Sequence, residues 1–107
     1  MHKRITFRSM AHSDAIESYI HVKIEKLRKF FKREPNPIYI DIVLEPHREK
    51  NFFKVEFKLH SFHYHIVVKT EGFDMYTMID EAVHKMIKEM IRKKDRLGHE
   101  FRMVYSV

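Results

Sequence analysis

The sequence has no cysteine and no tryptophan, and only 2 glycines and 3 prolines among 107 residues. Without cysteine there is no disulfide, no thiolate zinc site and no cysteine nucleophile. The scarcity of glycine and proline, with 44% hydrophobic residues, excludes collagen-like, low-complexity and disordered chains. No run approaches the roughly 18 apolar residues of a membrane span, and the N-terminus lacks a signal-peptide core. We therefore expect a globular cytoplasmic protein with no membrane partner.

Positive charge is in excess, with 21 Lys and Arg against 15 Asp and Glu and a net charge of +6. A basic balance favours an anionic partner.

The length predicts a single domain over residues 1–107. Nothing in the sequence marks an enzyme, since it has no Gly-rich phosphate loop, no nucleophile motif and no pair of carboxylates in an apolar setting. We expect no cofactor.

Four segments alternate apolar and polar residues with the period of two that is typical of strands with one buried face. They cover residues 4–8, 38–45, 53–60 and 64–70. The last two follow each other closely, which predicts an antiparallel hairpin.

Apolar residues at intervals of three and four predict a helix between the first two strands. Ser13 or Asp14 can cap it, and Asp14 with Glu17 has the spacing of a capping box. It should end near Lys32, because Pro35 cannot continue a helix and disfavours helical geometry at the residue before it.

A second helix is predicted from Asp74, with Gly98 as its stop and a short C-terminal tail at about residues 99–107. The element order is thus β-α-β-β-β-α. Each helix has one apolar stripe and each strand one apolar face. The simplest packing is an α+β, two-layer sandwich with both helices on one face of a four-stranded sheet.

Basic residues follow both predicted helices. Spacings of three and four place Lys85, Lys88, Arg92 and Arg96 on one ridge, with Lys93 beside it. Such a ridge can contact successive phosphates of a nucleic acid. It is equally what a solvated helix face needs, and basic residues late in a helix complement its dipole.

On the first helix, Lys23 falls within the apolar arc and Lys26 lies at its edge, so both side chains must extend past the core to reach water. If the helices lie side by side, these lysines and the ridge could border one groove. The alternative is that their stems merely cover apolar surface.

Three histidines stand close together at His60, His63 and His65. His63 and His65 would share a strand face and could chelate zinc, with His60 across the hairpin as a third ligand. Solvated imidazoles on the open sheet face are the favoured interpretation, and we predict no metal site. Their role and that of the tail are left open.

Residues 71–80 read Glu-Gly-Phe-Asp-Met-Tyr-Thr-Met-Ile-Asp. This segment resembles the Glu-Gly-x-Asp-Met-Tyr-x-x-Ile-Asp pattern of the bacterial ribosome hibernation-promoting factors and ribosome-associated inhibitors, also described as modulators of the nitrogen sigma factor. The resemblance spans about residues 4–100. It includes Ile5-Thr6 and the basic run from Lys85 to Leu97, and on the first helix it includes Ala15, Lys23, Lys26, Leu27 and Phe31.

The resemblance implies the β-α-β-β-β-α fold and a protein that binds the small ribosomal subunit where messenger and transfer RNAs lie, inhibiting translation in stationary phase or stress. It implies binding to 70S ribosomes without catalysis, as a monomer. Gly72 would serve the turn and Asp74 the helix cap. The side chains facing ribosomal RNA would be Lys23, Lys26, Lys85, Lys88, Arg92, Lys93, Lys94 and Arg96.

Two departures from the family pattern matter. The hairpin turn carries Phe62-His63-Tyr64 where the family is often Gly-rich. A chain ending at residue 107 would be a short form without the C-terminal dimerisation domain. Short forms either promote ribosome dimers, together with a second factor, or hold single ribosomes inactive, and both stay open. The alternative function is a general double-stranded RNA-binding module, although such modules usually place a lysine cluster at the start of the final helix, where this chain is acidic.

Overall fold

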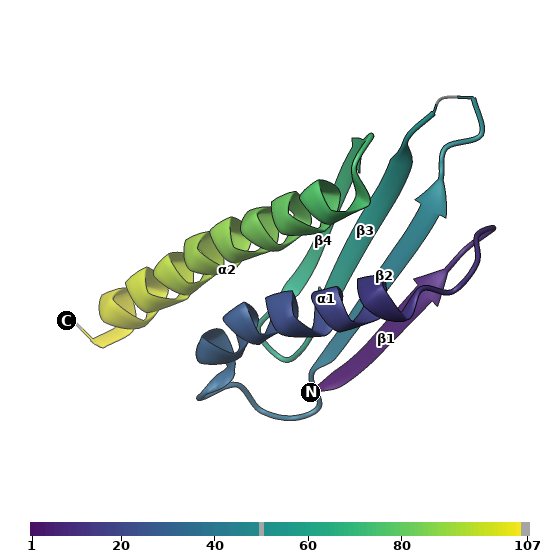
Figure 1. The fold of residues 1–107 in the computed structure, drawn as a ribbon. Helices are drawn as coiled ribbons and strands as arrows, with labels where there is room; N and C mark the ends of the chain where they lie inside the picture. Colours follow the sequence, from purple (N-terminus) through teal and green to yellow (C-terminus); the bar gives the residue numbers. More distant parts are fainter. Residues whose placement is uncertain (50, 106–107) are drawn as a thin grey trace.

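The computed structural model describes the backbone of residues 1–49 and 51–105 and the side chains of residues 1–49 and 51–95. Four strands, two α-helices and a 3-10 helix follow one another along the chain (Figure 1). They are β1 His2–Phe7, α1 Asp14–Ile24, η1 Glu25–Phe31, β2 Tyr39–Pro46, β3 Phe53–His60, β4 His65–Gly72 and α2 Met75–Tyr105.

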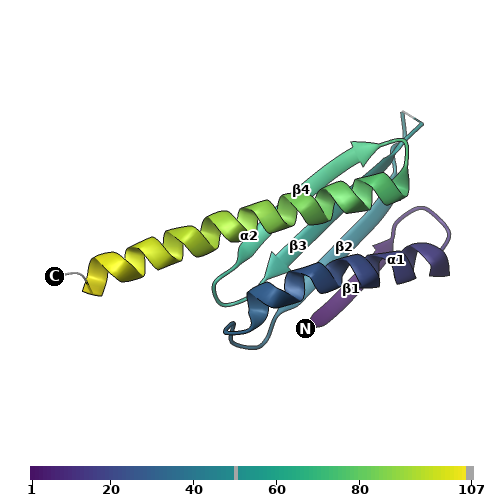
Figure 2. The same ribbon diagram turned by 60° about the vertical axis from the view of Figure 1, so that its left-hand side comes forward.

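The strands form one sheet in the order β1-β2-β3-β4. β1 runs parallel to β2, whereas β2, β3 and β4 pair as successive antiparallel neighbours. α1, η1 and α2 cover one face of this sheet, with α2 over β3 and β4 (Figures 1 and 2). The predicted two-layer α+β sandwich with the order β-α-β-β-β-α is therefore confirmed.

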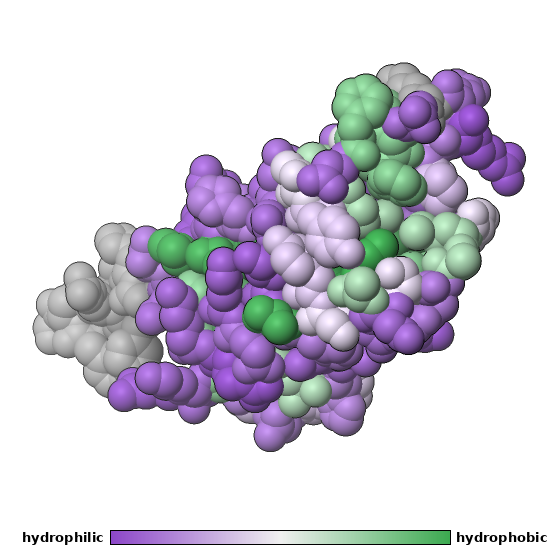
Figure 3. All heavy atoms as spheres, in the orientation of Figure 1, coloured by the Kyte–Doolittle hydropathy of each residue, from purple (hydrophilic) through white to green (hydrophobic). Residues whose placement is uncertain are grey.

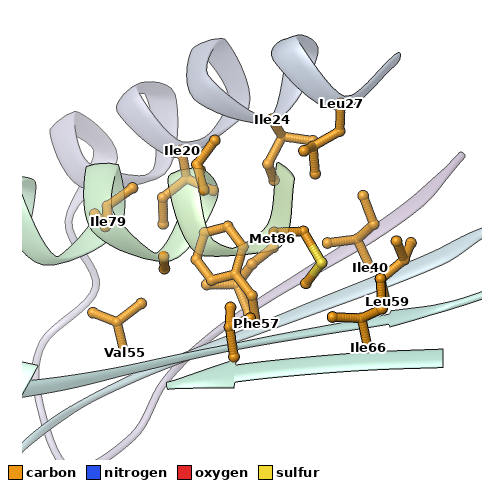
Figure 4. Packing of buried hydrophobic residues seen from close by; sticks show 14 of the residues in the cluster. Ile20, Ile24, Leu27, Ile40, Val55, Phe57, Leu59, Ile66, Ile79 and Met86 are labelled. Atoms are coloured by element: carbon orange, nitrogen blue, oxygen red, sulfur yellow. The ribbon is translucent and has the colours of Figure 1, made fainter. Parts of the chain in front are cut away.

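The core lies between the two layers and comes from the apolar stripes of the helices and from the apolar positions that alternate along the strands (Figure 4). Ile40, Ile42 and Leu44 of β2 are buried, as are Phe57 and Leu59 of β3. Their sequence neighbours point to the opposite face, because successive strand residues alternate between faces. The sheet consequently keeps one face that none of the described helices covers.

The first helix begins where expected, but its second half differs from the prediction. Ser13 is the cap, since its Oγ accepts a hydrogen bond of 3.2 Å from the Ile16 N–H. Asp14 is already the first residue of the helix, so it is not the capping residue and does not form the expected capping box with Glu17.

From Glu25 the backbone tightens into the 3-10 helix η1. Residues three apart eclipse each other in a 3-10 helix, and Arg28 Nε lies 2.7 Å from Glu25 Oε2. Hydrogen bonds from Arg28 and then from Lys3 lower the pKa of Glu25 to about 2. Over only seven residues, the apolar pattern of a 3-10 helix with 3.0 residues per turn cannot be distinguished from that of an α-helix with 3.6. The sequence therefore predicted one continuous α-helix.

Asp74 begins α2 as predicted, because its Oδ2 accepts a 2.6 Å hydrogen bond from the Thr77 hydroxyl and its Oδ1 accepts one from the Tyr76 N–H. The role expected for Gly72 is wrong. Its φ angle is not in the left-handed region, and a Cβ at this position would lie 2.6 Å from the Sδ of Met78. Gly72 packs closely against the end of the Met78 side chain and does not adopt the left-handed conformation that is specific to glycine.

Gly98 does not end α2, which continues to Tyr105. A glycine inside a helix costs only about 1 kcal/mol relative to alanine, and no proline follows within the helix. The segment expected as a tail is therefore helical as far as residue 105, and α2 extends well past the sheet (Figure 2). Over the described residues, no helix has both the length and the hydropathy that crossing a membrane requires.

Candidate nucleic-acid interface

A groove lies between α2 and the outer edge of β4. The spacing of three and four residues brings Lys85, Lys88 and Arg92 to the same side of α2, and Lys93 joins them. β4 forms the other wall from His65 to Lys69, and the hollow has a volume of about 510 Å3. We call it the basic groove, because its lining contains five Lys and Arg side chains and one carboxylate, that of Glu89.

The cationic side chains of the basic groove differ in the hydrogen bonds and ion pairs that they make. Lys85 Nζ donates a 3.2 Å hydrogen bond to the Lys69 carbonyl, and Arg92 lies 3.2 Å from Glu89. Lys88 forms no ion pair with any described residue. Surface ion pairs such as Arg92 with Glu89 contribute at most about 1 kcal/mol, so a phosphate could compete for the guanidinium.

A second groove of about 270 Å3 lies between the two helices. Lys23 of α1 and Lys26 of η1 form one side, and Val83, His84 and Ile87 of α2 form the other together with Asp80. We call it the interhelical groove. The net charge of its lining is less positive than that of the basic groove, because it contains two lysines and the carboxylate of Asp80.

Lys23 reaches past the core as predicted. Its ammonium lies 5.1 Å from the centroid of the Tyr19 ring and 3.5 Å from Asp80 Oδ1. The Asp80 carboxylate, followed by Tyr19, raises the pKa of Lys23 above its ordinary value. The side chain therefore stays charged, but part of its charge is already matched by Asp80.

The two basic sets do not border one groove, contrary to the sequence expectation. Val83 and Ile87 turn toward α1, so the ridge that begins at Lys85 faces β4 on the other side of α2. The periodicity of a helix gives the angle between its faces but not the direction in which each face points. Lys94 is exposed and lines neither groove, and the side chain of Arg96 lies outside the described residues.

The sequence interpretation missed five polar residues that line the grooves. They are His65, Lys69, Asp80, His84 and Glu89. Alternation placed His65 and Lys69 on the polar side of β4, but only the strand order shows that β4 is an edge strand beside α2. Hydrophilic residues cover most of the surface over α2 and α1 (Figure 3).

The three neighbouring histidines separate in the structure. His60 and His65 face each other across the β3–β4 hairpin with ring centroids 4.5 Å apart. His63 lies in the turn and its ring bonds to Glu34, so it does not share a strand face with His65. Among the described residues, the three side chains that bring possible ligand atoms within 4.8 Å of one another are instead the exposed His12 and Asp14 and the half-buried Glu17.

The fold and its grooves define a small α/β sandwich with cationic hollows on both sides of its last helix. Residues 4–98 match the model of a family described as Sigma 54 modulation protein / S30EA ribosomal protein. The chain belongs to this family.

Relatives and solved structures agree with that assignment. A Salmonella typhimurium protein named ribosome hibernation promoting factor is 29% identical over 91% of this chain and 97% of its own. A Klebsiella oxytoca protein of the same name is 30% identical over the same shares.

Two solved structures share the fold. The N-terminal domain of Thermus thermophilus Protein Y matches with a TM-score of 0.69 at 22% identity, covering 86% of this chain and 98% of that chain. A ribosomal subunit interface protein from Coxiella burnetii matches with a TM-score of 0.73 at 20% identity, covering 89% and 99%.

Proposed function

We propose that this protein is a ribosome hibernation factor of the bacterial cytoplasm. It binds the small ribosomal subunit, alone or in the 70S ribosome, in the channel for messenger and transfer RNA, and inhibits translation in stationary phase or stress. The observation that carries the proposal is the basic groove, with five cations against one carboxylate. Relatives that share nearly their whole length with this chain are named for ribosome hibernation.

The mechanism is occupancy of the channel without catalysis. Lys85, Lys88, Arg92 and Lys93 would contact phosphates of ribosomal RNA, each contact releasing condensed counterions. Binding should therefore weaken steeply with salt. Lys23 and Lys26 would add a second line of contact, and Lys94 and Arg96 would extend the first along α2. A monomer that fills this channel excludes the RNAs that translation requires.

Sedimentation of purified protein with ribosomes tests the proposal. At physiological salt we expect the protein to migrate with small subunits and 70S ribosomes and to inhibit cell-free translation. Protein that stays at the top of the gradient would contradict it. Whether ribosome dimers form in stationary-phase lysate, where a second dimerising factor is supplied, separates the two roles of short forms.

General binding of double-stranded RNA is the alternative. Residues 74–84, which begin α2, contain no lysine or arginine, so the sequence does not favour a duplex contact at that end. Equal affinity for isolated RNA duplexes and for ribosomes would support it.

A further inference from the structure

Four aromatic rings cross the open face of the sheet in one row. His2, Tyr39, His60 and His65 lie directly opposite one another on β1, β2, β3 and β4. Successive ring centroids are 5.1, 6.4 and 4.5 Å apart. Strand alternation turns the row away from the core, since the neighbouring Ile40 and Leu59 are buried. Tyr39 is 44% exposed.

Beside this row lies a hollow of about 360 Å3, within the range of small-molecule sites. The rings of Tyr39, His60 and His65 from this row line the hollow. Phe62 of the β3–β4 turn and the loop that precedes β2 complete the lining. We call it the ring-lined hollow. Its lining residues are Pro35, Asn36, Pro37, Tyr39, His60, Ser61, Phe62 and His65.

Phe62 is an exposed aromatic side chain held at a defined place. Its ring is 73% exposed and packs edge-to-face on His63 with centroids 4.7 Å apart. The buried Glu34 carboxylate fixes His63, accepting hydrogen bonds from its backbone N–H at 2.7 Å and from its ring. Glu34 also accepts a hydrogen bond from the Ser61 hydroxyl.

This clamp makes the turn a rigid platform. The Glu34 side chain is 3% exposed, so a buried carboxylate joins the turn to the segment after η1. Burial alone would raise the pKa of Glu34, but the hydrogen bonds from Ser61 and His63 outweigh it and lower the pKa. The group therefore stays ionised and keeps its three donors in place.

The ring-lined hollow and the basic groove share one lining residue, His65 of the edge strand β4. A single-stranded nucleic acid carries both phosphates and flat aromatic groups, and under the proposed function that nucleic acid is ribosomal RNA. Unpaired bases stack on exposed aromatic side chains, with about 1–3 kcal/mol per base.

We propose that the ring-lined hollow binds one unpaired nucleobase of an RNA strand whose phosphates lie in the basic groove, with Phe62 as the stacking surface. The imidazoles of His60 and His65 and the amide of Asn36 supply polar groups for the edge of the base. The inference rests on the proposed function, because it deepens the contact between this protein and ribosomal RNA.

The experiment compares ribosome affinities of Phe62 variants by sedimentation. Phe62→Ala and Phe62→Leu should each weaken binding by about tenfold, the stacking value for one base, whereas Phe62→Trp should retain it. Phe73→Ala is the matched control, because Phe73 is 78% exposed and lies just past the other end of β4, next to Phe52. Thermal unfolding confirms that each variant folds.

The outcomes separate the two proposals. Wild-type affinity in Phe62→Ala overturns the nucleobase site and leaves the proposed function intact. Wild-type affinity in Phe62→Leu combined with loss in Phe62→Ala also overturns it, since this pattern indicates an apolar contact with a ribosomal protein.

If the wild-type protein does not bind ribosomes, the proposed function fails and a second measurement judges the hollow. Fluorescence anisotropy then compares a 12-nucleotide single-stranded RNA with a version of equal charge that lacks its central bases. Wild-type preference for the complete RNA, lost in Phe62→Ala, supports the site, and equal affinities overturn it.

Discussion

The Tyr19 hydroxyl donates a hydrogen bond of 2.6 Å to Asp80 Oδ1 and so joins α1 to α2. Asp80 also faces the Lys23 ammonium at 3.5 Å, and Tyr19 packs edge-to-face on Tyr76 of α2 with centroids 4.8 Å apart. The carboxylate therefore holds the helices together and reduces the positive charge of the interhelical groove.

Removing the two partners should separate these effects. Tyr19→Phe loses the hydrogen bond and should lower the free energy of unfolding by about 1 kcal/mol, measured by urea denaturation, with ribosome affinity unchanged.

Asp80→Asn removes the charge and should raise ribosome affinity by about two- to fivefold, as expected for one surface charge. Weaker binding in Asp80→Asn would contradict the view that the Asp80 charge opposes RNA binding.

Charge reversal in the basic groove should abolish most binding without unfolding the protein. Lys88→Glu with Arg92→Glu should weaken ribosome binding by about two orders of magnitude and lower the slope of log affinity against log salt by about 2. Both side chains are exposed, so stability should change by less than about 1 kcal/mol.

The matched control for that pair is Arg4→Glu with Arg48→Glu. It makes the same change in net charge at exposed positions outside both grooves. Equal losses in the two pairs would mean that total charge, rather than the groove, determines binding.

Acid should remove the contribution of Glu34 to stability. The pKa of Glu34 is lower in the folded state than the usual value of about 4.3. Its contribution is therefore complete above the unfolded value and is lost as pH falls through the folded value. Glu34→Gln should lower the free energy of unfolding by about 1–3 kcal/mol at pH 7. Urea denaturation should show the difference between the two proteins shrinking as pH falls below the unfolded value, and a difference that stays constant would refute the assignment.

Packing at Gly72 gives a prediction that involves no charge. In Gly72→Ala the new Cβ would meet the Met78 side chain, of which Sδ and Cε lie 2.6 Å away. We expect a loss of about 1–2 kcal/mol in the free energy of unfolding. Met78→Ala opens that space, so the double mutant should lose less than the sum of the two single mutants. Strict additivity in urea denaturation would disprove the contact.

The sequence predicted those features of the fold that local patterns specify. Alternation identified the buried faces of the strands, including Ile38 and Ile42, and the cap at Asp74 followed from a side chain and its nearest neighbours. The family resemblance was confirmed over residues 4–98. The residues assigned to RNA contact remain predictions.

Features that depend on partners distant in sequence could not be predicted. Glu34 precedes a proline and looked like a loop residue, yet its hydrogen-bond partners lie 27 and 29 residues away. The separation of Lys23 from Lys88 depends on how α2 is rotated against the sheet, which its own periodicity does not specify. The prediction that α2 ends at Gly98 was wrong, because a glycine can end a helix but can also lie inside one.

The bond from Lys85 to the Lys69 carbonyl has a consequence for self-association. β4 is an edge strand, and an unpaired edge carbonyl is a site where a strand from another molecule can add. The Lys85 ammonium occupies this acceptor at 3.2 Å and places a charge beside the edge. Replacing Lys85 to weaken RNA binding would also expose the edge, so such a variant should aggregate more readily than one altered at Lys88.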